Sequence, residues 1–170
     1  FFVNSGAEAV ENAIKVARYA TGRKSIIAFE DGFHGRTYMT LSLTSQVDPY
    51  KVGFGPYASD VYRIPYAYCY RCPLALTYPG CGCGCASLLE NAFDKHVNAD
   101  DVAAVIAEPV QGEGGFIVPP PEYMGKIKKI CEERGILLIA DEIQSGLGRT
   151  GRWFAMEHWG VTPDIVVTAK

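Results

Sequence analysis

The chain has 170 residues, of which 48% are hydrophobic and 21% are charged, proportions that suffice for one well-buried globular core. The net charge of -3 is spread without a basic stripe, which argues against a nucleic-acid partner. No apolar run approaches the roughly 20 residues of a membrane span and no signal peptide opens the chain, so we expect no membrane partner and a cytoplasmic location.

The first predicted helix follows Ser5 and ends at Gly22. Ser5 with Glu8 three residues later is typical of a capping box, and apolar residues recur at helical spacing from Val10 to Ala17. An ordinary amphipathic helix with a good cap explains these residues by themselves. Backbone N–H groups at a helix N-terminus also bind anions, which is the alternative function of this turn.

A strand is predicted over residues 25–30, and the loop 31–37 follows it. Phe33 in this loop can stack on a planar ring, and the guanidinium of Arg36 can bind a carboxylate with two parallel hydrogen bonds. The simpler alternatives are a core position for Phe33, a hydrogen-bonded loop histidine for His34 and a surface salt bridge for Arg36.

Residues 46–65 are rich in Gly, Pro and Tyr without a sustained period, so we expect a long excursion over the surface. Five of the six cysteines follow it closely. A Cys-x2-Cys pair with a second close set has the spacing of a zinc site with thiolate ligands. Disulfides and unlinked thiols are the alternatives, and no neighbouring base indicates a catalytic cysteine. The expected staple consists of Cys69, Cys72, Cys81 and Cys85, with Cys83 as an extra thiol.

Helices and strands alternate in the second half of the chain. A helix is predicted over 86–97 and a buried strand over 102–107, which ends in Glu108. The next helix runs from Pro121 to Arg134, with proline at its start and glycine after its end. A short helix over 153–159 is expected to pack as core.

Two further apolar runs, 136–140 and 163–169, are predicted to be buried parallel strands. Asp141 ends the first and Lys170 ends the second, so both side chains should project into one crevice at the carboxyl edge of the sheet. A cofactor with a basic ring nitrogen and an aldehyde needs such a carboxylate and such an amine. The other lysines, including Lys51, are expected to be solvated. The repeated units predict an α/β fold, a three-layer and mainly parallel sheet with helices on both faces.

Residues 141–146, with Gly148–Gly151 and the closing Ala169–Lys170, resemble the class III, pyridoxal-phosphate-dependent aminotransferases, which include 4-aminobutyrate and acetylornithine aminotransferases. The similarity covers almost the whole chain except the cysteine-rich stretch. It implies that residues 1–170 are part of the large cofactor-binding domain, with an insertion at about 66–85, and that an N-terminal segment and a C-terminal small domain are absent. It also implies a homodimer or a dimer of dimers.

The resemblance implies roles for individual residues. Many relatives carry a hydroxyl residue where Ala7 stands, so one contact to the cofactor phosphate would be lost. Arg36 and Glu113 would serve the substrate, although solvated charges on a glycine-rich hairpin also explain Glu113. The residues implied to bind the cofactor are Ser5, Gly6 and Ala7 at the phosphate, Phe33 and Ile143 on the ring faces, Gln144 at the phenolic oxygen, and His34, Glu108, Asp141 and Lys170.

The implied activity is a ping-pong transamination from an amino acid or 4-aminobutyrate-like ω-amino acid to a 2-oxo acid, through a Schiff base on Lys170. A racemase or epimerase of the same family is the nearest alternative. A catalytically inactive, zinc-bearing scaffold is the alternative of another class, although the presence of Asp141, Gln144, Phe33 and Lys170 argues against it. We expect these 170 residues alone to have little activity.

Overall fold

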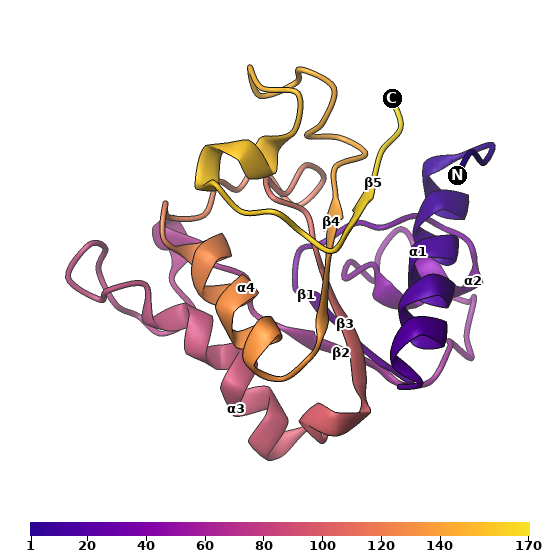
Figure 1. The fold of residues 1–170 in the computed structure, drawn as a ribbon, viewed down its shortest axis with the longest axis horizontal. Coiled ribbons are helices and arrows are strands. Elements are labelled where there is room, and N and C mark those ends of the chain that lie inside the picture. Colours follow the sequence, from indigo (N-terminus) through magenta and orange to yellow (C-terminus); the bar gives the residue numbers. More distant parts are fainter.

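The computed structural model describes residues 1–170 as a five-stranded parallel sheet between two layers of helices (Figure 1). Every strand pairing is parallel. The predicted α/β fold is therefore confirmed. The spatial order is β2-β1-β3-β4-β5, with β1 at Ser25–Phe29, β2 at Val61–Ile64, β3 at Val102–Ala107, β4 at Leu137–Asp141 and β5 at Ile165–Val167.

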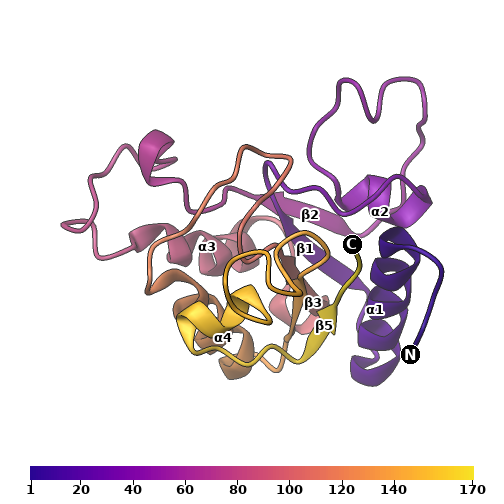
Figure 2. The ribbon, with the colours of Figure 1, turned by 90° about the horizontal axis from the view of Figure 1, so that it is seen from above.

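Helices α1 (Gly6–Thr21) and α2 (Tyr38–Leu43) cover one face of the sheet, and α3 (Leu88–Lys95) and α4 (Tyr123–Glu133) cover the other (Figure 2). None of them combines the length and the apolar character that a membrane crossing requires. Short 3₁₀ turns connect the larger elements at Cys69–Arg71, Gly84–Ser87, Ala99–Asp101 and Ala155–Trp159.

The alternation of side chains along β1 explains the two layers. Ile26 and Ala28 belong to the apolar cluster under α1, whereas Ile27 and Phe29 belong to the cluster under α3 and α4. The central strand β3 is buried at every residue because both of its faces are covered. Its sequence therefore contains no polar side chain.

Helix α1 begins and ends where the sequence predicts. The Glu8 N–H donates to Ser5 Oγ at 3.2 Å, and Gly22 ends the helix with a φ of 70°. The reciprocal bond of a capping box is absent, because the Glu8 carboxylate instead accepts from the backbone N–H of Asn4 at 2.7 Å.

The stretch predicted as a surface excursion contains strand β2, which forms one edge of the sheet beside β1. With four residues and a partly exposed face, this strand lacks the apolar run that marks a buried one. The same stretch contains Lys51, which is only 4% exposed rather than solvated.

Two further expectations about burial are wrong. Strand β5 is the opposite edge of the sheet, and Val166 within it is 42% exposed. Trp153 is 72% exposed and does not pack as core, whereas Trp159 packs partly buried against the apolar cluster under α4.

The strand order determines where a ligand can bind. The chain adds β2 on one side of β1 and then returns to place β3 on the other side. In open α/β sheets, such a reversal opens a crevice at the carboxyl ends of the strands. The loops 30–37 and 108–113 leave β1 and β3 at this point.

Candidate active site

A pocket of about 540 Å³, called the site pocket below, lies at this carboxyl edge of the sheet. All the residues implied to bind cofactor or substrate line it, except Ser5. Asp141 at the end of β4 and Lys170 after β5 are among them, so neighbouring strands bring a carboxylate and an amine to one space. A pocket of this size suits a small molecule with several polar groups.

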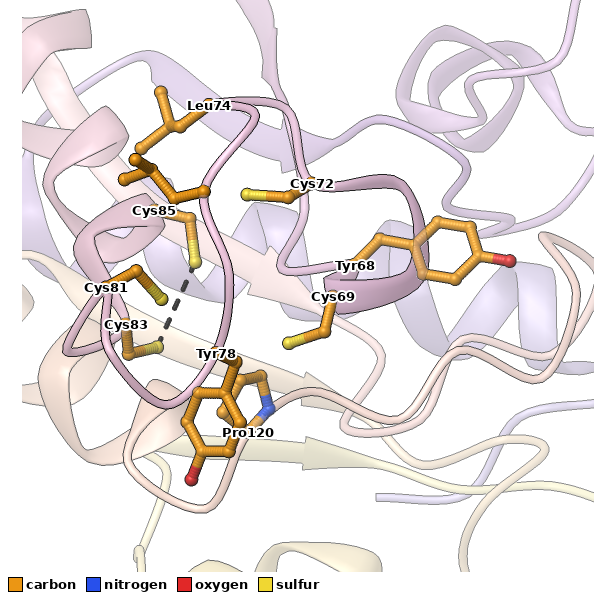
Figure 3. Close-up of a pocket in the computed structure, with 10 residues that line it drawn as sticks. Tyr68, Cys69, Cys72, Leu74, Tyr78, Cys81, Cys83, Cys85 and Pro120 are labelled. Atoms are coloured by element: carbon orange, nitrogen blue, oxygen red, sulfur yellow. Dashed lines mark hydrogen bonds between the residues drawn. The ribbon is translucent and has the colours of Figure 1, made fainter.

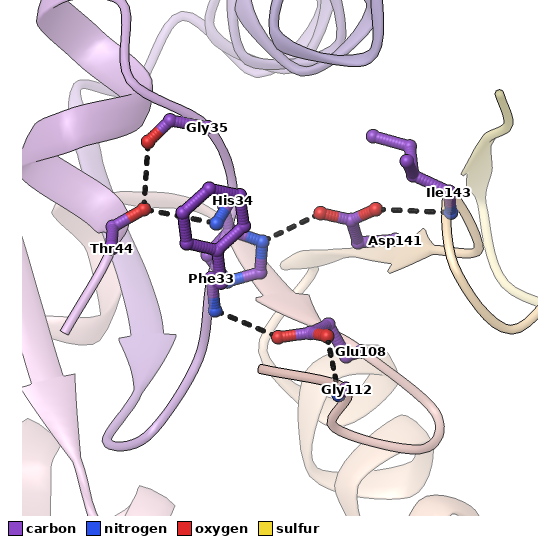
Figure 4. Close-up of polar contacts among 8 residues, drawn as sticks. All are labelled: Phe33, His34, Gly35, Thr44, Glu108, Gly112, Asp141 and Ile143. Carbon is purple, nitrogen blue, oxygen red and sulfur yellow. Dashed lines mark hydrogen bonds and ion pairs between the residues drawn. The ribbon is translucent and has the colours of Figure 1, made fainter. Parts of the chain in front are cut away.

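Asp141 is 3% exposed and faces His34, which is 2% exposed (Figure 4). Asp141 Oδ2 lies 2.7 Å from His34 Nδ1, and Oδ1 accepts from the Ile143 N–H at 3.2 Å. Burial alone lowers the pKa of His34, but the hydrogen bond and charge of Asp141 outweigh it, and the pKa is raised from 6.5. The pair therefore favours a protonated imidazole beside the carboxylate.

Glu108 joins the loops that follow β1 and β3 (Figure 4). One carboxylate oxygen accepts from the Phe33 N–H at 2.8 Å, and the other accepts from the Gly112 N–H at 3.0 Å. Burial raises the pKa of Glu108, and the charge of His34 and the two N–H donors oppose this rise without cancelling it. The bonds fix the backbone that carries the Phe33 ring.

The first turn of α1 forms another wall of the site pocket through Gly6 and Ala7. Two close approaches require glycine here. A Cβ on Gly6 would lie 2.9 Å from Ile143 Cδ1, and a Cβ on Gly35, whose φ is +123°, would lie 2.9 Å from Ala7 Cβ. The free N–H groups of this helix end favour an anion at the pocket.

Ser5 caps α1 and lies outside the lining of the site pocket. Its side chain accepts from the Glu8 N–H, so its structural role is clear. A contact from Ser5 to a cofactor phosphate stays a prediction.

Lys170 donates from Nζ to Gln144 Oε1 at 2.5 Å. The Gln144 amide in turn lies against the backbone of Gly112, where a Cβ would come within 2.6 Å of Gln144 Nε2. A side chain at position 112 would therefore displace the amide that holds the Lys170 amine.

Arg36 and Glu113 line the site pocket from exposed positions. Arg36 takes part in no ion pair, so the surface salt bridge considered from the sequence is not formed. Its guanidinium is free to bind an acidic group. The substrate roles of both residues stay predictions.

Sequence reasoning missed several residues of this region, above all Thr44. Its Oγ1 accepts from the His34 N–H at 3.0 Å and donates to the Gly35 carbonyl at 2.9 Å. No motif marks Thr44, because its partners lie nine and ten residues earlier across a helix. Gly35, Thr37 and Ala169 also line the site pocket.

The five clustered cysteines, called the thiol cluster, do not form the expected staple. They gather around a narrow and mostly apolar hollow (Figure 3), but all six cysteines of the chain are free. No group of three or more potential ligands is placed to hold a metal ion, so zinc is not supported. Burial raises the pKa of Cys83, the thiol outside the expected four, to about 12. The members are Cys69, Cys72, Cys81, Cys83 and Cys85.

A family model described as aminotransferase class-III matches residues 1–170. A probable 4-aminobutyrate aminotransferase of Bacillus subtilis is 47% identical over 169 residues, which are 99% of this chain and 39% of that protein. A leucine/methionine racemase of Thermococcus litoralis is 45% identical over 98% of this chain and 37% of its own length. The crystal structure of a PLP-bound amine transaminase from an uncultivated Pseudomonas species matches with a TM-score of 0.91 and 34% identity, covering 98% of this chain and 38% of that one.

Proposed function

Because the chain belongs to the class-III aminotransferases, we propose that the intact protein is a pyridoxal-phosphate-dependent transaminase. It would move an amino group from an amino acid or ω-amino acid to a 2-oxo acid. The chain spans about 39% of the length of the Bacillus relative, so this activity belongs to the intact protein. One observation carries the proposal, namely the buried carboxylate of Asp141 and the amine of Lys170 in one pocket.

The residues of the site pocket fit the cofactor's three chemical groups. The N-terminus of α1 suits its phosphate, the carboxylate of Asp141 suits its ring nitrogen, and the amine of Lys170 suits its aldehyde. Phe33 and Ile143 are apolar and suit the two faces of its ring. When bound, the cofactor supplies an electron sink for the bond broken at the substrate carbon.

The chain's own groups have distinct tasks in this proposal. His34 orients the Asp141 carboxylate through the contact of its Nδ1 with Oδ2, at 2.7 Å. Lys170 would hold the cofactor covalently through its Nζ. The same amine, placed in the site pocket, would serve as the base that takes the proton from the substrate carbon.

The donor class follows from the charge around the site pocket. Arg36 reaches the pocket without an ion-pair partner, so its guanidinium suits the carboxylate of an amino acid or ω-amino acid. Glu113 also lines the pocket, and its carboxylate suits an arginine from outside these residues. A 4-aminobutyrate-like donor is therefore our first choice of substrate.

A racemase is the second candidate, and the 45% identity to the leucine/methionine racemase supports it. To decide between the two candidates, the intact protein with its cofactor is incubated with 4-aminobutyrate and 2-oxoglutarate. In a separate reaction it is incubated with one enantiomer of leucine. A transaminase converts more than one donor molecule per cofactor only when the 2-oxo acid is present. Interconversion of leucine enantiomers without any 2-oxo acid would contradict the proposal. An inactive scaffold would show neither reaction and no visible cofactor absorbance.

A further inference from the structure

The ring of Phe33 is packed by Tyr50, which lies outside the site pocket. The two ring centroids are 5.1 Å apart and the planes meet at 60°, an edge-to-face arrangement. Tyr50 belongs to the loop 45–60, which stands out from the sheet beside α2 (Figure 2). It is the only aromatic ring paired with Phe33.

The turn that carries Tyr50 is anchored beneath its surface. Lys51 is 4% exposed, donates from Nζ to the Thr44 carbonyl at 2.9 Å and lies 5.0 Å from the centroid of the Tyr57 ring. Thr44 also binds the backbone of His34 through its hydroxyl. One residue therefore connects the turn at Tyr50 to the loop that carries Phe33.

The backbone and the side chain of Phe33 are held by different contacts. Glu108 accepts from its N–H and thereby fixes the backbone, but this bond leaves the side-chain torsions free. Packing by a neighbouring ring restricts those torsions. The contact with Tyr50, which lies outside the site pocket, supplies that restriction.

We propose that Tyr50 is a positioning residue that fixes the plane of the Phe33 ring against the planar ring of the cofactor. This inference rests on the proposed function, since it requires a planar cofactor in the site pocket. Tyr50 would act through Phe33 alone, because it does not line the pocket. Its phenolic oxygen makes no hydrogen bond in the structure, so the ring and not the hydroxyl carries the effect.

The test compares Tyr50→Leu with the matched control Tyr50→Phe in the intact protein. Loss of an edge-to-face contact should weaken cofactor binding about 2- to 10-fold in Tyr50→Leu and leave Tyr50→Phe unchanged. The visible circular dichroism of the bound cofactor should also change in Tyr50→Leu, because that signal depends on how the ring is oriented. Affinity is measured by titrating pyridoxal phosphate into the apo protein.

A double-mutant cycle separates positioning from general stability. In a Phe33→Leu background, Tyr50→Leu should have no further effect on cofactor affinity or on the visible signal. Two results would overturn this inference without touching the proposed function. One is an equal loss of cofactor affinity on Tyr50→Leu in the wild-type and Phe33→Leu backgrounds, and the other is a Tyr50→Leu protein with the cofactor affinity of the wild type. A Tyr50→Leu protein that does not fold while Tyr50→Phe does would assign Tyr50 a structural role and also overturn it. A wild-type protein that develops no cofactor absorbance would overturn the proposed function together with this inference.

Discussion

The Nδ1 of His34 and the Oδ2 of Asp141 lie 2.7 Å apart although 107 residues separate them in the sequence. The contact joins the loop after β1 to the end of β4, across the intervening strand β3. Both side chains are almost fully buried. Removing one partner would leave the other as a buried polar group without its ion pair, so the two residues should be sensitive to the same changes of pH and sequence.

The first prediction concerns the pH dependence of stability. The pKa of His34 is raised above its ordinary value of 6.5 in the folded protein, so the folded state binds the proton more tightly than the unfolded state. The resulting stabilisation is fully present below about pH 6.5 and is lost as the pH rises through the raised pKa. Urea unfolding of the intact apo protein should therefore give a lower free energy of unfolding at about pH 9 than at about pH 6.5. His34→Gln should lose this difference, and an equal pH dependence in the variant would contradict the assignment.

The second prediction concerns Asp141→Ala. Removal of the charged contact at the cofactor ring should weaken cofactor binding by about 1.5–3 kcal/mol and reduce the turnover rate by orders of magnitude. Asp94→Ala, on the exposed face of α3, is the control and should keep the cofactor affinity and the turnover rate of the wild type. Titration of the cofactor and steady-state rates measure the two effects. Activity of Asp141→Ala within a few-fold of the wild type would show that Asp141 has no such role.

The third prediction concerns the cysteines. All six are free, and burial raises the pKa of Cys131 to about 12, so its thiol should stay protonated at neutral pH. Iodoacetamide should label the exposed Cys69 in the native protein and leave Cys131 unmodified. After unfolding without a reductant, peptide mapping should find all six positions labelled. Pairs of cysteines in the thiol cluster that stay unlabelled after unfolding would instead demonstrate disulfides.

Local patterns in the sequence predicted the regular elements because their burial is periodic. The apolar positions of α1 and the continuous apolar run of β3 indicate their elements without knowledge of their neighbours. Strand β2 depends on pairing with β1 along a single edge, so its own four residues have no distinctive pattern. Lys51 looked solvated for the same reason, since its burial depends on the Thr44 carbonyl and the Tyr57 ring.

The sequence likewise predicted some residues of the candidate site and not others. Asp141 and Lys170 end apolar runs, and the rule that ligands bind at carboxyl strand ends placed them together. The contacts of Thr44 and Tyr50 follow no motif, because Thr44 reaches the loop after β1 from the end of α2 and Tyr50 reaches it from the loop 45–60. The zinc expectation failed because cysteine spacing does not determine whether the thiols converge on one point.

Covalent labelling of the cofactor lysine tests the central claim most directly. The intact protein, loaded with pyridoxal phosphate, is reduced with borohydride, digested and mapped for the pyridoxyl group. We predict that the label lies on Lys170, whose amine lines the site pocket, and that it is absent from Lys51, the one buried lysine of the domain. A label on Lys51 or on any other lysine, with Lys170 unmodified, would contradict the proposed mechanism.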